Sequence, residues 1–439
     1  MMQELQWLLL CWRNSLKNYI ELLKYSKTFK ILILVQFITY FGAWFSQIGV
    51  YTMLIEFDFS KFDWHIFGYE INHESMKKWA ISFSAVFAFL PTILMAPISG
   101  IIIDAFKSKK LLLLSIIIEL FSVFFLIFIK DASYIFILFL LIFIRLAVAS
   151  LYFQTEMSLL PHIFDKDRLK LANELFSVVW AISYTTGMAV AGVFIHYFGV
   201  YNAFLLDCFL FLIGISLLSF IKIEVKNEKF YFKNITKMAK EGLFYILNNK
   251  KIMHLILLHA FIGFTAYDAL INFLAGYDYL NKVYFFKEIL SAGLIIGLSN
   301  AIRALSLVIG PLVLSKIVNN KRLFYFFILQ GLGIITWALL QFNFWVSFIG
   351  LIFAGFFTST IWSFTYTAIQ NNCDKEYYGR VIAYVDMIYM SFSLFITLLT
   401  GWLFDNKIST FYITILIGSC FIIGAIYWQY FIRKFKCEN

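Results

Sequence analysis

Charged residues are scarce in this chain. Only 14% of its 439 residues are Asp, Glu, Lys or Arg, whereas 62% are hydrophobic and 20% are aromatic. A soluble globular protein has about 25% charged and about 45–50% apolar residues, so this composition excludes an ordinary soluble domain. A helix that crosses a bilayer needs about 20 apolar residues, and windows of this kind recur along the whole sequence.

The apolar runs predict an all-α membrane protein with twelve transmembrane helices in two six-helix halves. They are continuous and do not alternate, which excludes a transmembrane strand barrel. The predicted spans are residues 31–56, 79–103, 111–130, 132–156, 171–197, 202–222, 252–277, 288–315, 323–342, 344–368, 381–404 and 410–432.

Positive charge is unevenly distributed between the predicted loops. The chain has 36 Lys and Arg residues against 26 Asp and Glu. If the N-terminus lies inside, most of the basic residues fall in the two termini and the even-numbered loops. This positive-inside pattern predicts a multi-pass protein of the cytoplasmic membrane with both termini in the cytoplasm. The net charge of +10 therefore indicates topology, and we expect no nucleic-acid partner.

Cysteine and several short functional motifs are also lacking. The five cysteines are scattered and never spaced C-x-x-C, so they suggest neither a disulfide framework nor a zinc site. The absence of a Walker A loop argues against an ATP-driven pump. The acidic and histidine residues of the outer loop 57–78 follow no zinc spacing, so a solvated loop is favoured and we expect no cofactor or metal; these residues are Asp63, His65, Glu70, His73 and Glu74.

The longest basic segment, residues 223–251, divides the chain. We predict that it is a cytoplasmic linker between an N-terminal six-helix bundle, 31–222, and a C-terminal one, 252–432, with a cytoplasmic tail over 433–439. In residues 1–30 the Leu and aromatic side chains share one helical face. This pattern predicts a helix on the inner membrane surface, with a cytoplasmic extension of the first span as the alternative.

Weak internal matches favour a duplicated chain. The basic pair at 109–110, before the third span, corresponds to the pair at 321–322, before the ninth. The acid-base-acid triplet at 165–167, after the fourth span, corresponds to 374–376, after the tenth. Matches at corresponding loops with similar offsets are expected if the second half repeats the first.

Proline is rare as well, with only four in the chain. Pro91 and Pro97 fall in the second span, and Pro311 falls in the eighth, its counterpart. Proline removes a backbone hydrogen bond and bends a helix. These positions predict matching bends that serve either as hinges or as static kinks.

The loop after the second span reads GIIIDAFKSKK, residues 100–110. With this loop and twelve spans in two halves, the chain resembles the major facilitator superfamily. The corresponding loop of that family reads G-x-x-x-D-R-x-G-R-[RK]-[RK]. Gly100, Asp104, Lys109 and Lys110 match this pattern. The resemblance implies gating: the acid would contact a base or a helix N-terminus on a neighbouring span and lock the inner side shut. A plain topology anchor is the alternative.

Three further stretches, 156–173, 203–212 and 373–386, are similar to the efflux branch that includes the enterobactin exporter and macrolide efflux proteins. Its loop A-L-L-P-x-L-V-x-x-x-x-L-x-x-A-N matches Leu159, Leu160, Pro161, Leu169, Ala172 and Asn173, and its G-R-V matches Gly379-Arg380. This resemblance implies proton-coupled efflux of small amphipathic molecules such as drugs. An exporter of a siderophore or other endogenous metabolite is the alternative.

The expected partners are a small-molecule substrate, protons and the lipid bilayer. One chain can contain the whole pathway between its halves, so we expect a monomer. A membrane-embedded enzyme or a sensor is the remaining alternative. The sequence offers no convergent catalytic constellation and no sizeable soluble domain, so we expect no enzyme.

Each predicted half carries one deep acid and one deep base on adjacent spans: Glu119 with Arg145, and Asp268 with Arg303. A charge near the bilayer centre costs at least roughly 2.5–3.5 kcal/mol, so it usually faces the bundle interior. In one interpretation, Glu119 or Asp268 exchanges a proton and biases the conformation. In the other, the two acid-base combinations are permanent ion pairs.

Two further acids lie nearer the span ends. Asp386, shallow in the eleventh span, is assigned to gating, and Asp207, near the outer end of the sixth, to structure. Candidate substrate contacts are midspan polar and aromatic residues, because aromatic faces suit flat, apolar or cationic ligands. They are Gln36, Tyr40, Trp44 and Gln47 in the first span, Tyr267 and Asn272 in the seventh, and Trp362 and Tyr366 in the tenth.

Overall fold

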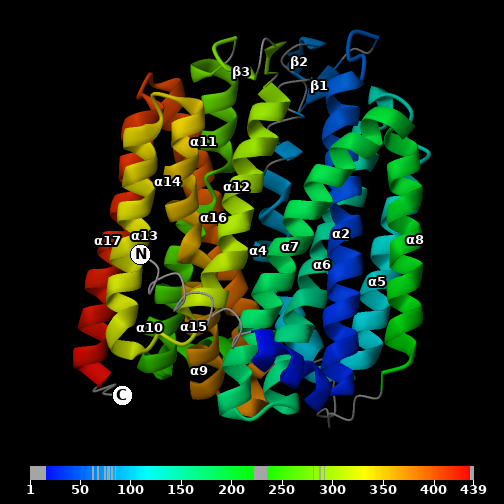
Figure 1. Cartoon of the computed structure of the whole chain (residues 1–439). Coiled ribbons are helices and arrows are strands. Elements are labelled where there is room, and N and C mark those ends of the chain that lie inside the picture. Colours follow the sequence, from blue (N-terminus) through cyan, green and yellow to red (C-terminus); the bar gives the residue numbers. More distant parts are fainter. Residues whose placement is uncertain are drawn as a thin grey trace.

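The computed structural model is an all-helical bundle with two short antiparallel hairpins (Figure 1). It describes residues 16–61, 64–66, 69–73, 76, 80, 83–84, 86–221, 235–279, 281–285, 288–290 and 292–435. The α-helices are α2 (Lys27–Glu56), α4 (Leu90–Ala105), α5 (Ser108–Leu126), α6 (Ile135–Ile163), α7 (Lys166–Phe198), α8 (Val200–Ser219), α9 (Ile235–Asn248), α10 (Lys250–Ala260), α11 (Asp268–Phe273), α12 (Ala292–Leu314), α13 (Asn320–Leu340), α14 (Phe344–Phe356), α15 (Thr358–Asn372), α16 (Tyr378–Asp405) and α17 (Thr410–Phe435).

The remaining elements are short. The strands β1 (Trp64–Ile66) and β2 (Tyr69–Ile71) form one hairpin, and β3 (Tyr284–Phe285) and β4 (Glu288–Ile289) form the other. Single helical turns occur at η1 (Ala132–Tyr134), η3 (Phe261–Thr265), η4 (Leu274–Asp278) and η5 (Lys375–Tyr377).

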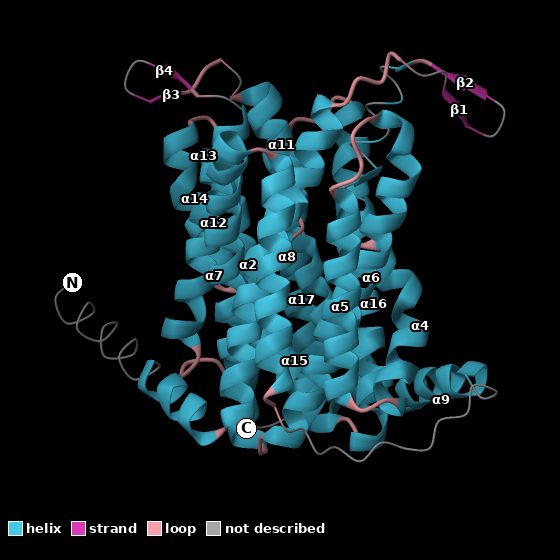
Figure 2. Ribbon diagram, turned by 90° about the vertical axis from the view of Figure 1, so that its right-hand side faces the viewer, coloured by secondary structure: helices cyan, strands magenta, loops and turns pink. Residues whose placement is uncertain are grey.

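The helices form two groups that lie side by side (Figure 1). The N-half contains α2 to α8, and the C-half contains α10 to α17. Figure 2 shows both hairpins at one end of the bundle, named here the hairpin end, and α9 across the other, the α9 end. Apolar side chains fill each half, because α2 packs against α7 and α8, and α13 packs against α14 and α17.

Ten helical segments in the described part are long and apolar enough to cross a membrane. This confirms the prediction of a multi-pass membrane protein. The predicted spans 79–103 and 111–130 correspond to α4 and α5. The described part of α4 has 16 residues, and α5 has 19 residues that include Lys109, Lys110 and Glu119.

Polar side chains mark the starts of several spans. Ser26, Asp165, Asn249, Asn319 and Asn343 each accept a hydrogen bond from a backbone N–H in the first turn of the helix that follows. Such caps satisfy backbone donors that have no partner inside the helix. The turns between the apolar runs therefore carry local signals that stop one helix and begin the next.

Two spans of the C-half are interrupted without a proline. In the seventh span, α10 ends at Ala260, η3 follows, and α11 begins at Asp268. A Cβ on Gly263 at this interruption would lie 2.7 Å from the carbonyl oxygen of Tyr389, so glycine allows close packing on α16. In the tenth span, Phe357 separates α14 from α15. Discontinuous helices often line the binding sites of transporters.

Parts of several predicted segments lie outside the described residues. In the N-terminal segment 1–30, residues 1–15 are outside, whereas residues 16–25 are helical with Tyr19 and Leu22 buried. In the linker 223–251, residues 223–234 are outside, and α9 follows. Asp63 and Glu74 of the loop 57–78 are also outside. The tail residues 436–439 are outside as well, and so are residues 79, 81, 82 and 85 of the predicted second span.

Candidate transport site

The two halves meet most closely toward the α9 end. The apolar core of the C-half continues into Met157 and Leu160 of α6 and into Leu169 and Phe176 of α7. These residues lie on both sides of the α6–α7 turn, which is at the α9 end (Figure 1). The N-half has a separate core that extends to the hairpin end. The halves are therefore closed against each other at the α9 end.

Asp104, at the end of α4, contacts the first turn of α16 in the other half. Its Oδ1 accepts a hydrogen bond from the backbone N–H of Gly379 at 2.9 Å, and its Oδ2 accepts one from Nε of Arg380 at 2.6 Å. The Arg380 side chain is only 4% exposed and that of Asp104 12%. The carboxylate thus caps the helix and also forms a charge-assisted ion pair, as the family resemblance implied.

Glycine at two positions makes this contact possible. A Cβ on Gly100 would lie 2.7 Å from Cα of Arg380, which is closer than real side chains approach a backbone atom. A Cβ on Gly379 would collide with Oδ1 of Asp104. Both glycines are therefore required by the close approach of α4 to α16.

The two bases of the same loop stay within the N-half. Lys109 donates to the carbonyl oxygen of Ser219, at the end of α8, at 2.7 Å. Lys110 is exposed. Lys109 anchors the loop within the N-half, and the contact across the interface belongs to Asp104.

Helix α9 covers the Asp104 contact. Glu241 lies 3.8 Å from Nη1 of Arg380, and Gly242 packs on the Arg380 side chain. The hydroxyl of Tyr245 donates to Asp374 at 3.1 Å and accepts from its backbone N–H at 2.9 Å. Burial raises the pKa of Tyr245, which keeps this hydroxyl neutral. The segment that joins the halves thereby supports the start of α16.

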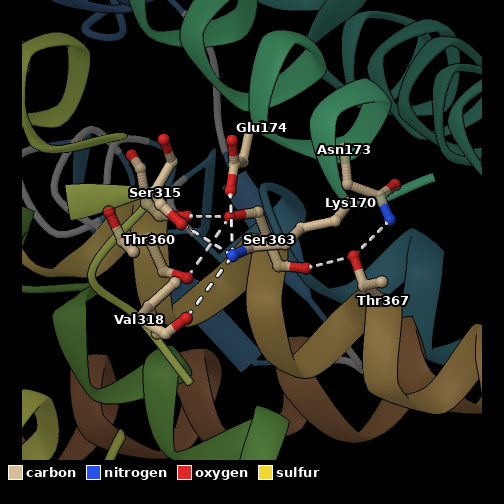
Figure 3. Close-up of polar contacts among 9 residues, drawn as sticks. Lys170, Asn173, Glu174, Ser315, Val318, Thr360, Ser363 and Thr367 are labelled. Atoms are coloured by element: carbon tan, nitrogen blue, oxygen red, sulfur yellow. Dashed lines mark hydrogen bonds and ion pairs between the residues drawn. The ribbon is translucent and has the colours of Figure 1, made fainter. Parts of the chain in front are cut away.

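Lys170 on α7 makes a second contact between the halves (Figure 3). Its Nζ donates to the carbonyl oxygens of Ser315 at 2.6 Å and Val318 at 3.4 Å, just beyond the end of α12, and lies 3.9 Å from Oε1 of Glu174. An ammonium group is favourable at a helix C-terminus, where carbonyl groups lack partners. Lys170 therefore caps α12 as Asp104 caps α16, with the opposite charge.

A layer of neutral polar contacts lies beside Lys170. Asn173 donates to Thr367 Oγ1 at 2.8 Å and to Gln370 Oε1 at 2.7 Å, both on α15. Gln370 in turn donates to the carbonyl oxygen of Met157 on α6 at 2.8 Å. Figure 3 shows Asn173 pointing from α7 toward Thr367. These hydrogen bonds extend the closure across the α9 end.

The deep arginine of the N-half pairs differently from the prediction. Arg145 lies 3.8 Å from Oδ2 of Asp207 and donates to the carbonyl oxygen of Ala43 at 2.8 Å. Asp207 is fully buried and also accepts from Ser46. Glu119 is buried and close enough to be attracted by Arg145, but their predicted ion pair is not formed. Glu119 was predicted as the partner because its span precedes that of Arg145 directly. Instead, the packing of α8 against α2 brings Asp207 close to the arginine.

In the C-half, the deep acid and the deep base lie together, as the ion-pair interpretation expects. Arg303 Nη1 lies 3.0 Å from Oδ1 of Asp268. The Asp268 side chain is 53% exposed although it lies within a span, whereas that of Arg303 is 10% exposed. The guanidinium lies 5.0 Å from the ring centre of Tyr267 and 5.8 Å from that of Tyr184 in the N-half. This pair faces the interface between the halves.

The predicted substrate contacts have different surroundings. Gln36 is fully buried and donates to the carbonyl oxygen of Phe176, and Tyr267 is buried and donates to that of Ala354, which are packing contacts. Trp44 is half-buried against Tyr184, with ring centres 4.7 Å apart. Three other candidates are half-buried: Tyr40, Gln47 and Trp362. Asn272 is exposed, and Tyr366 is fully buried.

Several residues of the interface carried no prediction. Glu156, Glu174 and His259 are buried, and Arg380 and Lys170 form the cross-half contacts described above. Glu156 and Arg380 stand inside stretches that carry the family resemblance. Both residues lie close to the ends of predicted spans, where charged loop residues are ordinary, so no sequence pattern places them in the interface.

Comparison with known families agrees with this geometry. The model of the Major Facilitator Superfamily matches residues 32–397. The chain belongs to this family, and its fold is that of a transporter. No curated protein matches the sequence.

Solved structures show the same fold. A bacterial homologue of the iron transporter ferroportin in the outward-facing state has a TM-score of 0.68 at 15% identity and covers 93% of this chain and 100% of its own. The E. coli fucose:proton symporter has a TM-score of 0.64 at 13% identity, with 92% and 99% covered. The human organic anion transporter MFSD10 has a TM-score of 0.69 at 12% identity, again with 92% and 99% covered.

Proposed function

We propose that this protein exports small amphipathic molecules in exchange for protons, by alternating access across the cytoplasmic membrane. In this proposal the chain crosses the membrane twelve times, counting α4 and α5, and acts as a monomer. The α9 end and both termini face the cytoplasm, as the positive-inside pattern indicates. The described conformation is then closed on the inner side and corresponds to an outward-facing state.

One observation carries this proposal. The halves are held together at the α9 end by contacts between a charged side chain of one half and a helix end of the other, Asp104 with α16 and Lys170 with α12. Such contacts can break without unfolding either half, because each half also has helix packing of its own, α2 with α7 and α8, and α13 with α14 and α17. An inner side that opens and closes in this way is what alternating access requires.

Proton coupling needs a carboxyl group that gains and loses a proton during the cycle. Glu119 and Asp268 remain the predicted candidates. We expect that Glu119→Gln or Asp268→Asn retains substrate binding and loses proton-driven transport if that acid is the carrier. Full transport in both variants would remove both acids from this role.

Inside-out membrane vesicles containing the protein test the function. A pH gradient with the vesicle lumen acidic would be recorded with a fluorescent probe. Cationic dyes, macrolides, tetracyclines and siderophores would then be added one at a time. Proton-coupled export predicts that a substrate dissipates the gradient in these vesicles and not in protein-free vesicles. A response to siderophores alone would favour the alternative, export of an endogenous metabolite.

A further inference from the structure

Helix α9 leaves an apolar face uncovered at the α9 end of the bundle (Figure 2). Its other face is buried through Gly242 and Ile246. Three apolar side chains are between 42% and 59% exposed: Leu243, Phe244 and Leu247. Lys237 and Lys240, on the preceding turns, are exposed as well. A helix with an apolar face and lysines beside it is typical of helices that lie in the surface of a membrane.

A groove of about 760 Å³ is bordered by Phe244 of this face. It lies between the end of α9, the start of α10 at Lys250 and the end of α17 at Phe435. Lys250 begins one segment that is long and apolar enough to cross a membrane, and Phe435 ends another. The groove is therefore at the depth where the surface of the bilayer is expected.

The charges in the groove favour an anion. Lys250 and Lys251 line it, and neither forms an ion pair with another described residue. Glu241 is the one acid among the described residues of the lining. Its carboxylate is engaged by bases on both sides, with Nη1 of Arg380 at 3.8 Å and Nζ of Lys237 at 3.9 Å. The two groove lysines thus remain available to a negatively charged group.

Aromatic side chains line the rest of the groove. The rings of Tyr245 and Tyr377 are stacked, with their centres 4.2 Å apart and their planes at 4°. Phe244 and Phe435 complete this apolar lining. A soluble anion would contact the lysines and leave the aromatic surface in water. A phospholipid matches both parts, because its phosphate suits the lysines and its acyl chains suit the apolar side chains.

Helix α9 also rests on the contact that closes the inner side. It packs against α4 and α16, and a Cβ on Gly242 would lie 2.9 Å from Cβ of Arg380. The Arg380 guanidinium lies 4.4 Å from the ring centre of Tyr377, which lines the groove. Arg380 belongs to α16, which also carries Asp386, the buried acid predicted for gating. A ligand that holds α9 against Tyr377 therefore also holds the partner of Asp104.

We propose that an anionic phospholipid of the inner leaflet binds in this groove and thereby stabilises the closed inner side. The inference rests on the proposed function, which places the α9 end in the cytoplasm, and adds a regulatory partner to it. Lys250 and Lys251 bind the phosphate, and the acyl chains lie along Phe244 and Leu247. Opening moves α16 away from α4 and takes Tyr377 out of the groove, so the open state binds the lipid more weakly. The content of anionic lipid thus sets the ratio of closed to open transporter.

The test compares the purified full-length protein in nanodiscs of phosphatidylcholine with and without phosphatidylglycerol. Spin labels at the exposed Lys166 and Lys321, at the α9 end of the two halves, report the separation of the halves by pulsed electron paramagnetic resonance. We expect phosphatidylglycerol to shift the distribution toward the short separation. A lysine beside an anionic surface contributes about five-fold to binding. In Lys250→Gln/Lys251→Gln, the phosphatidylglycerol fraction needed for half of the shift should therefore rise about thirty-fold.

Two further variants separate the parts of the site. Lys27→Gln/Lys30→Gln removes two exposed lysines at the start of α2, at the same end of the bundle (Figure 1), and should keep the unsubstituted response. It matches the groove variant in charge, so it controls for attraction to the bilayer as a whole. Phe244→Gln keeps the groove lysines and removes an apolar contact. Hydrogen exchange at residues 241–248, measured by mass spectrometry, should become faster in this variant in both kinds of nanodisc.

The inference would be overturned if phosphatidylglycerol caused no shift, or if both double variants responded equally. Closure by inorganic phosphate in phosphatidylcholine nanodiscs would also overturn it, because the occupant would then be a soluble anion. So would closure that depends on protein concentration in detergent without lipid, which would indicate a second copy of the chain. In each case vesicle transport of any substrate would leave the proposed function standing. A separation that never changes, together with vesicles that dissipate no gradient, would refute the proposed function itself.

Discussion

At the residue scale, the interface depends on charges that the sequence marks only in part. The family loop pointed to Asp104, and its expected partner, a base or a helix N-terminus, turns out to be both at once, in Arg380 and Gly379. The apolar pattern was enough to predict that Arg145 of the N-half lies deep in the membrane. Its acid could not, because pairing with Asp207 depends on how α8 packs beside α2.

Asp104→Asn should weaken closure of the α9 end. Removing one partner of a mostly buried ion pair costs about 3 kcal/mol, which corresponds to about a hundred-fold change in the equilibrium between closed and open. We therefore expect slower turnover with unchanged substrate choice, measured by vesicle transport over a panel of substrates. Unchanged turnover would show that this loop serves only as a topology anchor.

Asp207→Asn should lower the stability of the N-half. It leaves Arg145 buried without its counter-charge, which costs about 3–5 kcal/mol. The midpoint of thermal unfolding in detergent should fall clearly below that of the exposed control Asp131→Asn. Equal midpoints would show that Glu119 alone balances the arginine.

At the element scale, the apolar runs predict the spans well and their interruptions poorly. Pro97 and Pro311 lie inside α4 and α12, and the matching bends there stay a prediction. The breaks of the seventh and tenth spans contain no proline, since they follow from close packing, as at Gly263 against Tyr389. Such packing involves residues far apart in the sequence, so no local pattern announces it.

Gly100→Val should separate α4 from α16. The side chain would collide with Cα of Arg380, and helix backbones cannot yield as flexible side chains can. We expect a more open α9 end, with the label separation between 166 and 321 shifted to longer distances. Gly192→Val on α7 is the matched control, because a Cβ there meets nothing within 4 Å. The same distances in both variants would contradict the account.

Lys170→Met should loosen the end of α12 and keep the apolar stem of the side chain. The carbonyl groups of Ser315 and Val318 would lose their donor, and Glu174 would lose its cation. We expect faster hydrogen exchange at residues 311–318, measured by mass spectrometry. Lys110→Met, which removes an exposed lysine of the N-half, should leave that exchange unchanged.

At the scale of the whole molecule, the resemblance of one loop and the two-half pattern were enough to predict the fold. The closed end could not be predicted, because it is built from turns that lie far apart in the chain. The two charged cross-half contacts occupy corresponding places in the two halves, a loop of one half at the start of a helix in the other. Their chemistry is inverted: Asp104 supplies an acid to α16, whereas the loop after α12 supplies carbonyl groups to Lys170.

Alternating access is tested most directly by measuring both ends of the molecule at once. One label pair would sit at Lys166 and Lys321 at the α9 end, and another at the exposed Asn202 and Tyr412 toward the hairpin end. Conditions that lengthen the first separation should shorten the second. If both separations changed together, or if neither changed in the presence of a transported substrate, the halves would not rock about a central site and the account would be wrong.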